Sequence, residues 1–161
     1  MLIGATLAIE VPKRRMIELV TTPIITASSI LLFGYWFRYT CLLILSAKTA
    51  QDYIGQVVAA NQLGFLAAQS ELTTNTPNLD HLRDQLDHDY AVLNRLLKAS
   101  PGDSFIENRM LGINYQVMGT LYRLNSRFSV VAARRALEEM AAVVAHMANA
   151  VGEHAACAAA A

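Results

Sequence analysis

The chain has 161 residues, which suits one domain with a hydrophobic core and is too short for two. Apolar residues make up 54% of it and charged residues 16%, against about 45–50% and about 25% in ordinary soluble domains. Thirteen basic residues balance thirteen acidic ones, so the excess positive charge typical of a nucleic-acid-binding protein is absent. Cys41 and Cys157 stand far apart in the sequence and form neither a disulfide framework nor a zinc motif.

The first predicted element is a transmembrane helix over residues 19–38, preceded by a basic segment, residues 1–18. Residues 19–37 carry no charge, and about 20 mostly apolar residues are needed to cross the hydrocarbon core of a bilayer. Aromatic rings and cations stand at its ends, as is typical of membrane–water interfaces. The residues that we expect at these interfaces are Lys13, Arg14, Arg15, Tyr35, Trp36, Arg38 and Tyr39.

A later placement of the span, over residues 27–45, would bury Arg38 in the middle of the membrane at a cost of about 3 kcal/mol. The earlier placement is therefore favoured, and residues 41–45 are interpreted as the start of a core helix. Three basic residues precede the span and two, Arg38 and Lys48, follow it. This difference favours an N-terminus on the inner side of the membrane.

Two alternatives to the span stay open. The run contains Pro23 and several hydroxyl residues, which would also suit a helix buried inside a soluble protein. A cleaved signal peptide is the other alternative, although no small-residue cleavage site follows the run closely.

Beyond Arg38 the apolar residues recur at helical spacing in four segments, approximately 40–72, 77–98, 104–124 and 130–151. Short connections between them predict an antiparallel four-helix bundle over residues 39–154. An alanine-rich tail, residues 155–161, follows. The fold class is therefore all-α, with the N-terminal transmembrane helix continuing into the bundle.

Apolar periodicity also assigns the inner face of each segment. In the second segment it consists of Leu79, Leu82, Leu86, Tyr90, Leu93 and Leu97. In the fourth it consists of Val130, Ala133, Leu137, Met140, Val144, Met147 and Val151. Asn61 falls in the middle of the first apolar stripe, where a lone polar residue can fix helix register or oligomeric state; the alternative is that Asn61 turns to a solvated edge. The residues assigned to the inner face of the third segment are Ile106, Met110, Ile113, Val117, Leu121 and Leu124.

One polar cluster could bind a metal ion. His81, Asp84 and His88 follow one another at intervals of three and four residues, so they share one face of the second helix and offer ligands that suit zinc. That face lies nearly opposite the leucine stripe, whereas metal sites in bundles project inward. The favoured interpretation is therefore a solvated acidic face, with the metal site as the alternative.

No catalytic motif is found in the sequence, and no cofactor is predicted. The expected function is that of a small single-span membrane protein with an interaction or sensory/accessory role. Its expected partners are membrane lipid and either a second copy of the chain or another helical protein, without nucleic acid. The alternatives are a metal-binding bundle that uses the histidine cluster and a soluble helical regulator.

Overall fold

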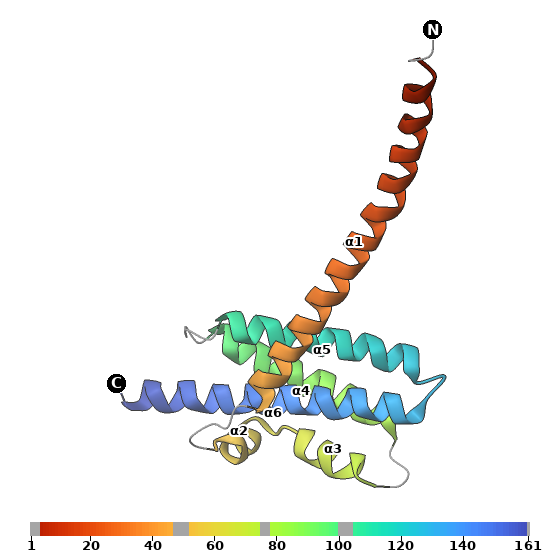
Figure 1. The fold of residues 1–161 in the computed structure, drawn as a ribbon. Helices are drawn as coiled ribbons and strands as arrows, with labels where there is room; N and C mark the ends of the chain where they lie inside the picture. Colours follow the sequence, from red (N-terminus) through yellow and green to blue (C-terminus); the bar gives the residue numbers. More distant parts are fainter. Residues whose placement is uncertain (1–3, 47–51, 75–77, 100–104, 161) are drawn as a thin grey trace. The chain divides into compact units, whose positions relative to one another are not determined.

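The computed structural model of the protein describes residues 4–46, 52–74, 78–99 and 105–160, with side chains described for 19–46, 52–74, 78–99 and 106–160. Within these ranges the chain is all-α and forms six helices without strands. The helices are α1 (Gly4–Ser46), α2 (Ile54–Asn61), α3 (Phe65–Leu72), α4 (Leu79–Ala99), α5 (Phe105–Asn125) and α6 (Val130–Ala160) (Figure 1).

The chain divides into two compact units, Met1–Thr40 and Cys41–Ala161. The division falls inside α1, two residues after the predicted end of the span at Arg38. In the first unit, α1 is the element described. The last turn and a half of α1 belongs to the second unit, together with α2–α6.

The expectation of one continuous helix over 40–72 is wrong, because this stretch contains the end of α1, then α2, then α3. The α2 helix stops at Asn61, and Gln62 adopts the left-handed conformation with φ 52°. Its backbone N–H bonds the carbonyl of Val58, which closes the helix end. The break allows Leu63 and Phe65, on either side of Gly64, both to be buried in the core.

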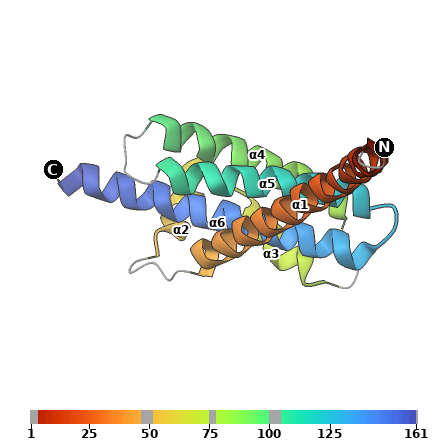
Figure 2. The same ribbon diagram turned by 45° about the horizontal axis from the view of Figure 1, so that its top comes forward.

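The central helix of the bundle is α6. The helices α2, α3, α4 and α5 each pack against it, and Figure 2 shows α4, α5 and α6 lying alongside one another. Small side chains on α6 permit this close approach. The buried alanines are Ala133, Ala136, Ala141 and Ala148.

The predicted inner faces of two helices are confirmed. On α4, Leu82, Leu86 and Leu93 are fully buried. On α6, Leu137 and Met140 are fully buried, and each such side chain contributes about 1.5–3 kcal/mol through burial. The heptad spacing read from the sequence therefore identifies the core correctly where one face of the helix is apolar and the other polar.

For α5 the predicted inner face is wrong. The six apolar residues assigned to it are exposed, except for half-buried Met110. The buried side of α5 lies about a third of a turn away. It consists of Leu111, Asn114, Tyr115, Met118 and Tyr122.

Candidate functional site

The apolar part of α1 is exposed in the structure. Every residue from 19 to 36 is solvent-exposed, and residues Leu19–Ser46 are long and apolar enough to cross a membrane. Its hydroxyl groups are satisfied within the helix, because Thr26 Oγ1 donates to the Thr22 carbonyl (2.9 Å) and Ser29 Oγ to the Ile25 carbonyl (2.8 Å). Polar groups bonded in this way can enter hydrocarbon without losing hydrogen bonds.

Aromatic side chains gather at the end of this exposed segment. The rings of Tyr35 and Tyr39 stack with centroids 6.4 Å apart, and those of Phe33 and Phe37 with centroids 6.5 Å apart. Trp36 is exposed. Arg38 is half-buried. The side chains of Lys13, Arg14 and Arg15 lie outside the described residues, so the predicted interface at the other end is not described.

Directly after this aromatic group, α1 enters the core of the bundle. Cys41 is fully buried, with its Sγ 4.0 Å from the carbonyl oxygen of Met110 on α5. Ile44 and Leu45 pack against the core cluster. Residues 41–45 are the last turns of α1 and not the start of a separate core helix; Cys41, Ile44 and Leu45 contact the bundle, while Leu42 and Leu43 are exposed.

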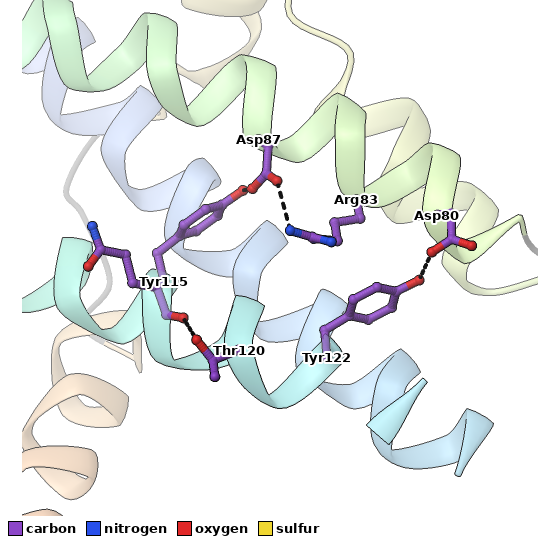
Figure 3. Close-up of polar contacts among 7 residues, drawn as sticks. Asp80, Arg83, Asp87, Tyr115, Thr120 and Tyr122 are labelled. Carbon is purple, nitrogen blue, oxygen red and sulfur yellow. Dashed lines mark hydrogen bonds and ion pairs between the residues drawn. The ribbon is translucent and has the colours of Figure 1, made fainter. Parts of the chain in front are cut away.

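Two tyrosine–aspartate hydrogen bonds join α4 to α5 (Figure 3). Tyr115 Oη donates to Asp87 (2.8 Å), and Tyr122 Oη donates to Asp80 (2.7 Å). The two aspartates are seven residues apart on α4, and the two tyrosines are seven apart on α5 in the opposite order. This matched heptad spacing is visible in the sequence, but spacing alone does not indicate that the two pairs face each other.

Arg83 and Tyr90 complete this group of α4 and α5 side chains. The Arg83 Nη2 atom lies 3.5 Å from Asp87 Oδ2, and its guanidinium lies 5.5 Å from the centre of the Tyr122 ring, within the range of cation–π attraction. The rings of Tyr90 and Tyr115 stack in parallel, with centroids 4.0 Å apart. The aromatic rings thus hold the carboxylates and the guanidinium in a fixed arrangement between the two helices.

The electrostatics of this group keep its phenols protonated. Burial, followed by the hydrogen bond to Asp80, raises the pKa of Tyr122 to about 12. Burial and the neighbouring Asp87 carboxylate raise the pKa of Tyr115 far above its ordinary value, and burial raises that of Tyr90. Phenols of this kind donate hydrogen bonds and are poor bases or nucleophiles at neutral pH. The group therefore acts as a structural clamp between α4 and α5.

The three residues of the predicted metal site all lie exposed on α4: His81, Asp84 and His88. Among the residues that the structure describes, no group of three or more His, Cys, Asp or Glu side chains is arranged to hold a metal ion. The metal site therefore gains no support from the geometry and stays a prediction. Asn61 donates through Nδ2 to the Val57 carbonyl (3.0 Å) at the end of α2; its predicted role in register also stays a prediction.

Three buried polar residues were not identified from the sequence: Asp89, Asn114 and Asn149. Asp89 accepts a hydrogen bond from the backbone N–H of Gly64 (2.8 Å), which precedes α3. Asn149 accepts one from the N–H of Tyr53 (2.8 Å), which precedes α2. The heptad position of Asp89, between buried Leu86 and Leu93, was the available signal.

Most of the exposed large apolar side chains on the described part of the bundle lie on α5, in the turn that follows it and at the start of α6. We define this α5 face as Ile106, Ile113, Val117, Leu121, Leu124, Phe128, Val130 and Val131, all exposed. Three exposed arginines border it: Arg109 and Arg123, fourteen residues apart and so on the same side of the helix, and Arg127 in the turn.

Comparison with known proteins gives no match to any family model, any curated protein or any solved structure.

Proposed function

We propose that this protein is a single-pass membrane protein in which α1 spans the bilayer over residues 19–38 and the bundle serves an interaction or accessory role at the membrane surface. The observation that carries the proposal is the unbroken exposure of residues 19–36. An apolar surface of this length is stable where lipid covers it. The alternative of a run buried inside a soluble fold requires that protein surface cover these residues instead of lipid.

The end of the span follows from the first residues of the bundle. Because Cys41 is buried in protein and Ile44 and Leu45 pack on the core, the hydrocarbon segment ends before Cys41. This supports placing Arg38 at the interface. The proposed antiparallel arrangement of the bundle is supported by the two tyrosine–aspartate bonds, which join α4 and α5 in opposite order.

Fractionation of cells followed by a carbonate wash tests the anchor. We expect the wild-type chain to stay in the membrane pellet. Leu31→Arg places a charge in the middle of the span, at a cost of about 3 kcal/mol, and should shift the protein toward the supernatant. The matched control Leu19→Arg places the same charge at the edge, where it can snorkel to the interface, and should leave the protein in the pellet.

Two results would contradict the anchor. Wild-type protein released by carbonate would mean that residues 19–37 are covered by protein. A mature chain whose mass shows that residues 1–37 have been removed would identify this segment as a signal peptide instead.

The orientation of the span can be read with the native cysteines, because Cys157 is exposed and Cys41 is buried. With the N-terminus inside, the bundle lies outside, and a membrane-impermeant maleimide should label Cys157 on intact cells. Cys157→Ser is the control for background labelling. Labelling that requires permeabilised cells would reverse the proposed orientation.

The interaction role is proposed to involve a second copy of the chain or another helical protein. Chemical cross-linking in intact membranes should trap a dimer, and Asn61→Leu should change the distribution of cross-linked species if Asn61 sets the register. A chain that stays monomeric both in membranes and in mild detergent would exclude self-association.

A further inference from the structure

We infer that the α5 face is a second membrane contact, which docks the bundle onto a bilayer surface that contains anionic lipid. The inference rests on the proposed function, since it requires the span to be in the membrane. Three independent features of the described residues support it: the shape of the apolar surface, the charge beside it, and its position along the chain.

The apolar surface has the form of an interfacial amphipathic helix. Its α5 members recur at intervals of three, four and seven residues, so they form one stripe along the helix, while Leu111, Met118 and Tyr122 on the other side are buried in the bundle. At the end of the stripe the turn presents Phe128, 87% exposed, followed by exposed Val130 and Val131. A stripe with an aromatic residue at its tip is typical of helices that lie in the headgroup region.

The positive charge of the arginines beside the surface favours an anionic partner. Glu107 is the one acidic residue of α5, against Arg109 and Arg123 on the helix and Arg127 in the turn after it. Within the described residues, none of the three arginine side chains forms an ion pair. Arginine beside an apolar stripe can bury its methylene groups and place its guanidinium among phosphates or carboxylates of lipid headgroups. A second copy of the chain would bring the same positive charge to the contact.

The third feature is that a short stretch of chain links this surface to the proposed span. Cys41 packs against Met110, one turn along α5 from Ile106 and one turn before Ile113. Arg38, the proposed end of the span, precedes Cys41 by three residues, about 4.5 Å of helix. Only a short stretch of chain therefore separates the proposed end of the span from the residue that contacts the N-terminal half of α5.

Fluorescence of the full-length protein in vesicles tests the inference. Val117→Cys, in a Cys157→Ser background, carries a polarity-sensitive nitrobenzoxadiazole label at the centre of the α5 face. The matched control is Ala91→Cys, which places the same label on the exposed side of α4. The Cys157→Ser parent measures background labelling of Cys41. The vesicles contain phosphatidylcholine with phosphatidylserine, and the quenchers are iodide in water and a spin-labelled lipid.

We expect the label at Val117 to be quenched by the spin-labelled lipid and to be at least about threefold less sensitive to iodide than the label at Ala91, because interfacial burial shields it from water. If iodide quenches both labels equally and the protein stays in the membrane after a carbonate wash, the inference is overturned but the proposed span is not. Shielding at Val117 from both quenchers, together with cross-linking between copies, would assign the face to a second chain and also overturn it. Release of the protein by carbonate would instead defeat the proposed function.

Substitution of the three arginines provides a second test of the inference. Each of Arg109→Gln, Arg123→Gln and Arg127→Gln should lower the ratio of docked to undocked label about fivefold in vesicles with phosphatidylserine, and have little effect in phosphatidylcholine alone. The control Arg95→Gln removes an exposed arginine from α4 and should leave the ratio unchanged. Equal effects of the α4 and α5 substitutions would contradict the assignment of anionic lipid.

Discussion

At the scale of residues, the two tyrosine–aspartate hydrogen bonds show that the aspartates of the α4 charge cluster connect α4 to α5. Asp80 and Asp87 have negative side chains that the sequence places on a polar face, and their partners, Tyr122 and Tyr115, are amphipathic. A phenol can bury its ring in the core and still reach a carboxylate at the edge. Hydrophobic periodicity alone does not distinguish this use of tyrosine from ordinary core packing.

Replacing both phenols should weaken the bundle and change its response to alkaline pH. Tyr115→Phe and Tyr122→Phe each remove one hydrogen bond and should lower the free energy of unfolding by about 1 kcal/mol, since the freed carboxylates can regain water. Urea titration of the full chain in mild detergent measures this. Tyr35→Phe, which removes an exposed phenol from α1, is the control and should have little effect.

The pH dependence follows from the raised pKa values. Below the ordinary tyrosine pKa of 10.0 the phenols are protonated in both states and their contribution is complete. As the pH rises from 10 toward the folded pKa of about 12 for Tyr122, the unfolded chain loses protons that the folded chain retains, so stability falls. We expect the double variant to show a shallower decline over this range; an unchanged decline would show that other groups cause it.

Alanine substitutions at two helical glycines should change the stability of the protein in opposite directions. A Cβ at Gly152 would collide with the Tyr53 side chain, whereas at Gly119 the nearest atom is Met140 Cε at 3.9 Å. Gly152→Ala should therefore destabilise the protein by about 1–3 kcal/mol through overpacking. Gly119→Ala should stabilise it by up to about 1 kcal/mol, because alanine favours helix. Thermal unfolding of both variants measures the difference, and a stabilised Gly152→Ala would contradict the described packing of α6 on Tyr53.

At the scale of elements, the short helices α2 and α3 depend on polar residues from other helices. The backbone N–H groups of Tyr53 and Gly64, which precede these helices, need acceptors, and Asn149 and Asp89 supply them. The first N–H of α2, that of Ile54, bonds the nearby Asp52. Because Asn149 and Asp89 are distant in sequence, local capping patterns do not reveal their part. This is why the stretch 40–72, which has helical periodicity throughout, was expected to form one helix.

Removing the acceptor at Gly64 should loosen α3 selectively. Asp89→Ala leaves the partly buried N–H group of Gly64 without this acceptor, at a cost of about 1–3 kcal/mol, and removes a negative charge from the start of α3. Hydrogen exchange should accelerate most in Phe65–Leu72. The neighbouring His88→Ala, at an exposed position, should change stability by less than about 0.5 kcal/mol. Uniform acceleration over all helices would argue against a local cap.

The α5 helix shows where sequence periodicity is ambiguous. It has two faces that can be buried, one wholly apolar and one mixed, with Leu111, Asn114 and Tyr115 on the mixed face. The apolar face is the better candidate for the core when the helix is considered alone. The mixed face is the buried one, and its polar groups form hydrogen bonds there. Asn114 donates to Glu139 (3.0 Å), and Tyr115 donates to Asp87. These hydrogen bonds offset the cost of removing the polar groups from water.

At the scale of the whole molecule, the structure divides into two compact units between Thr40 and Cys41. The charged and aromatic residues Arg38 and Tyr39 lead us to place the end of the span nearby, and this placement stays a prediction. Surfaces for lipid, for a partner chain or for a metal ion are harder to predict from the sequence. They depend on which faces remain uncovered after packing, and that depends on all helices together.

The second unit should retain its fold without the span. A chain that starts at Cys41 keeps the described core residues of the bundle, so we expect a helical circular dichroism spectrum and cooperative unfolding. With the α5 face exposed to water, it should also bind vesicles that contain phosphatidylserine more strongly than vesicles of phosphatidylcholine alone. A non-cooperative, unstructured fragment would show that the bundle requires α1 in order to fold.

The central place of α6 has a consequence for how the length of this chain can vary. One residue inserted after Ala141 would rotate the rest of the helix by about 100° and turn Val144, Met147 and Ala148 away from several neighbours at once. An insertion between residues 126 and 129, in the turn before α6, would leave those contacts in place. Insertions and deletions should therefore be tolerated between the helices and excluded from the interior of α6.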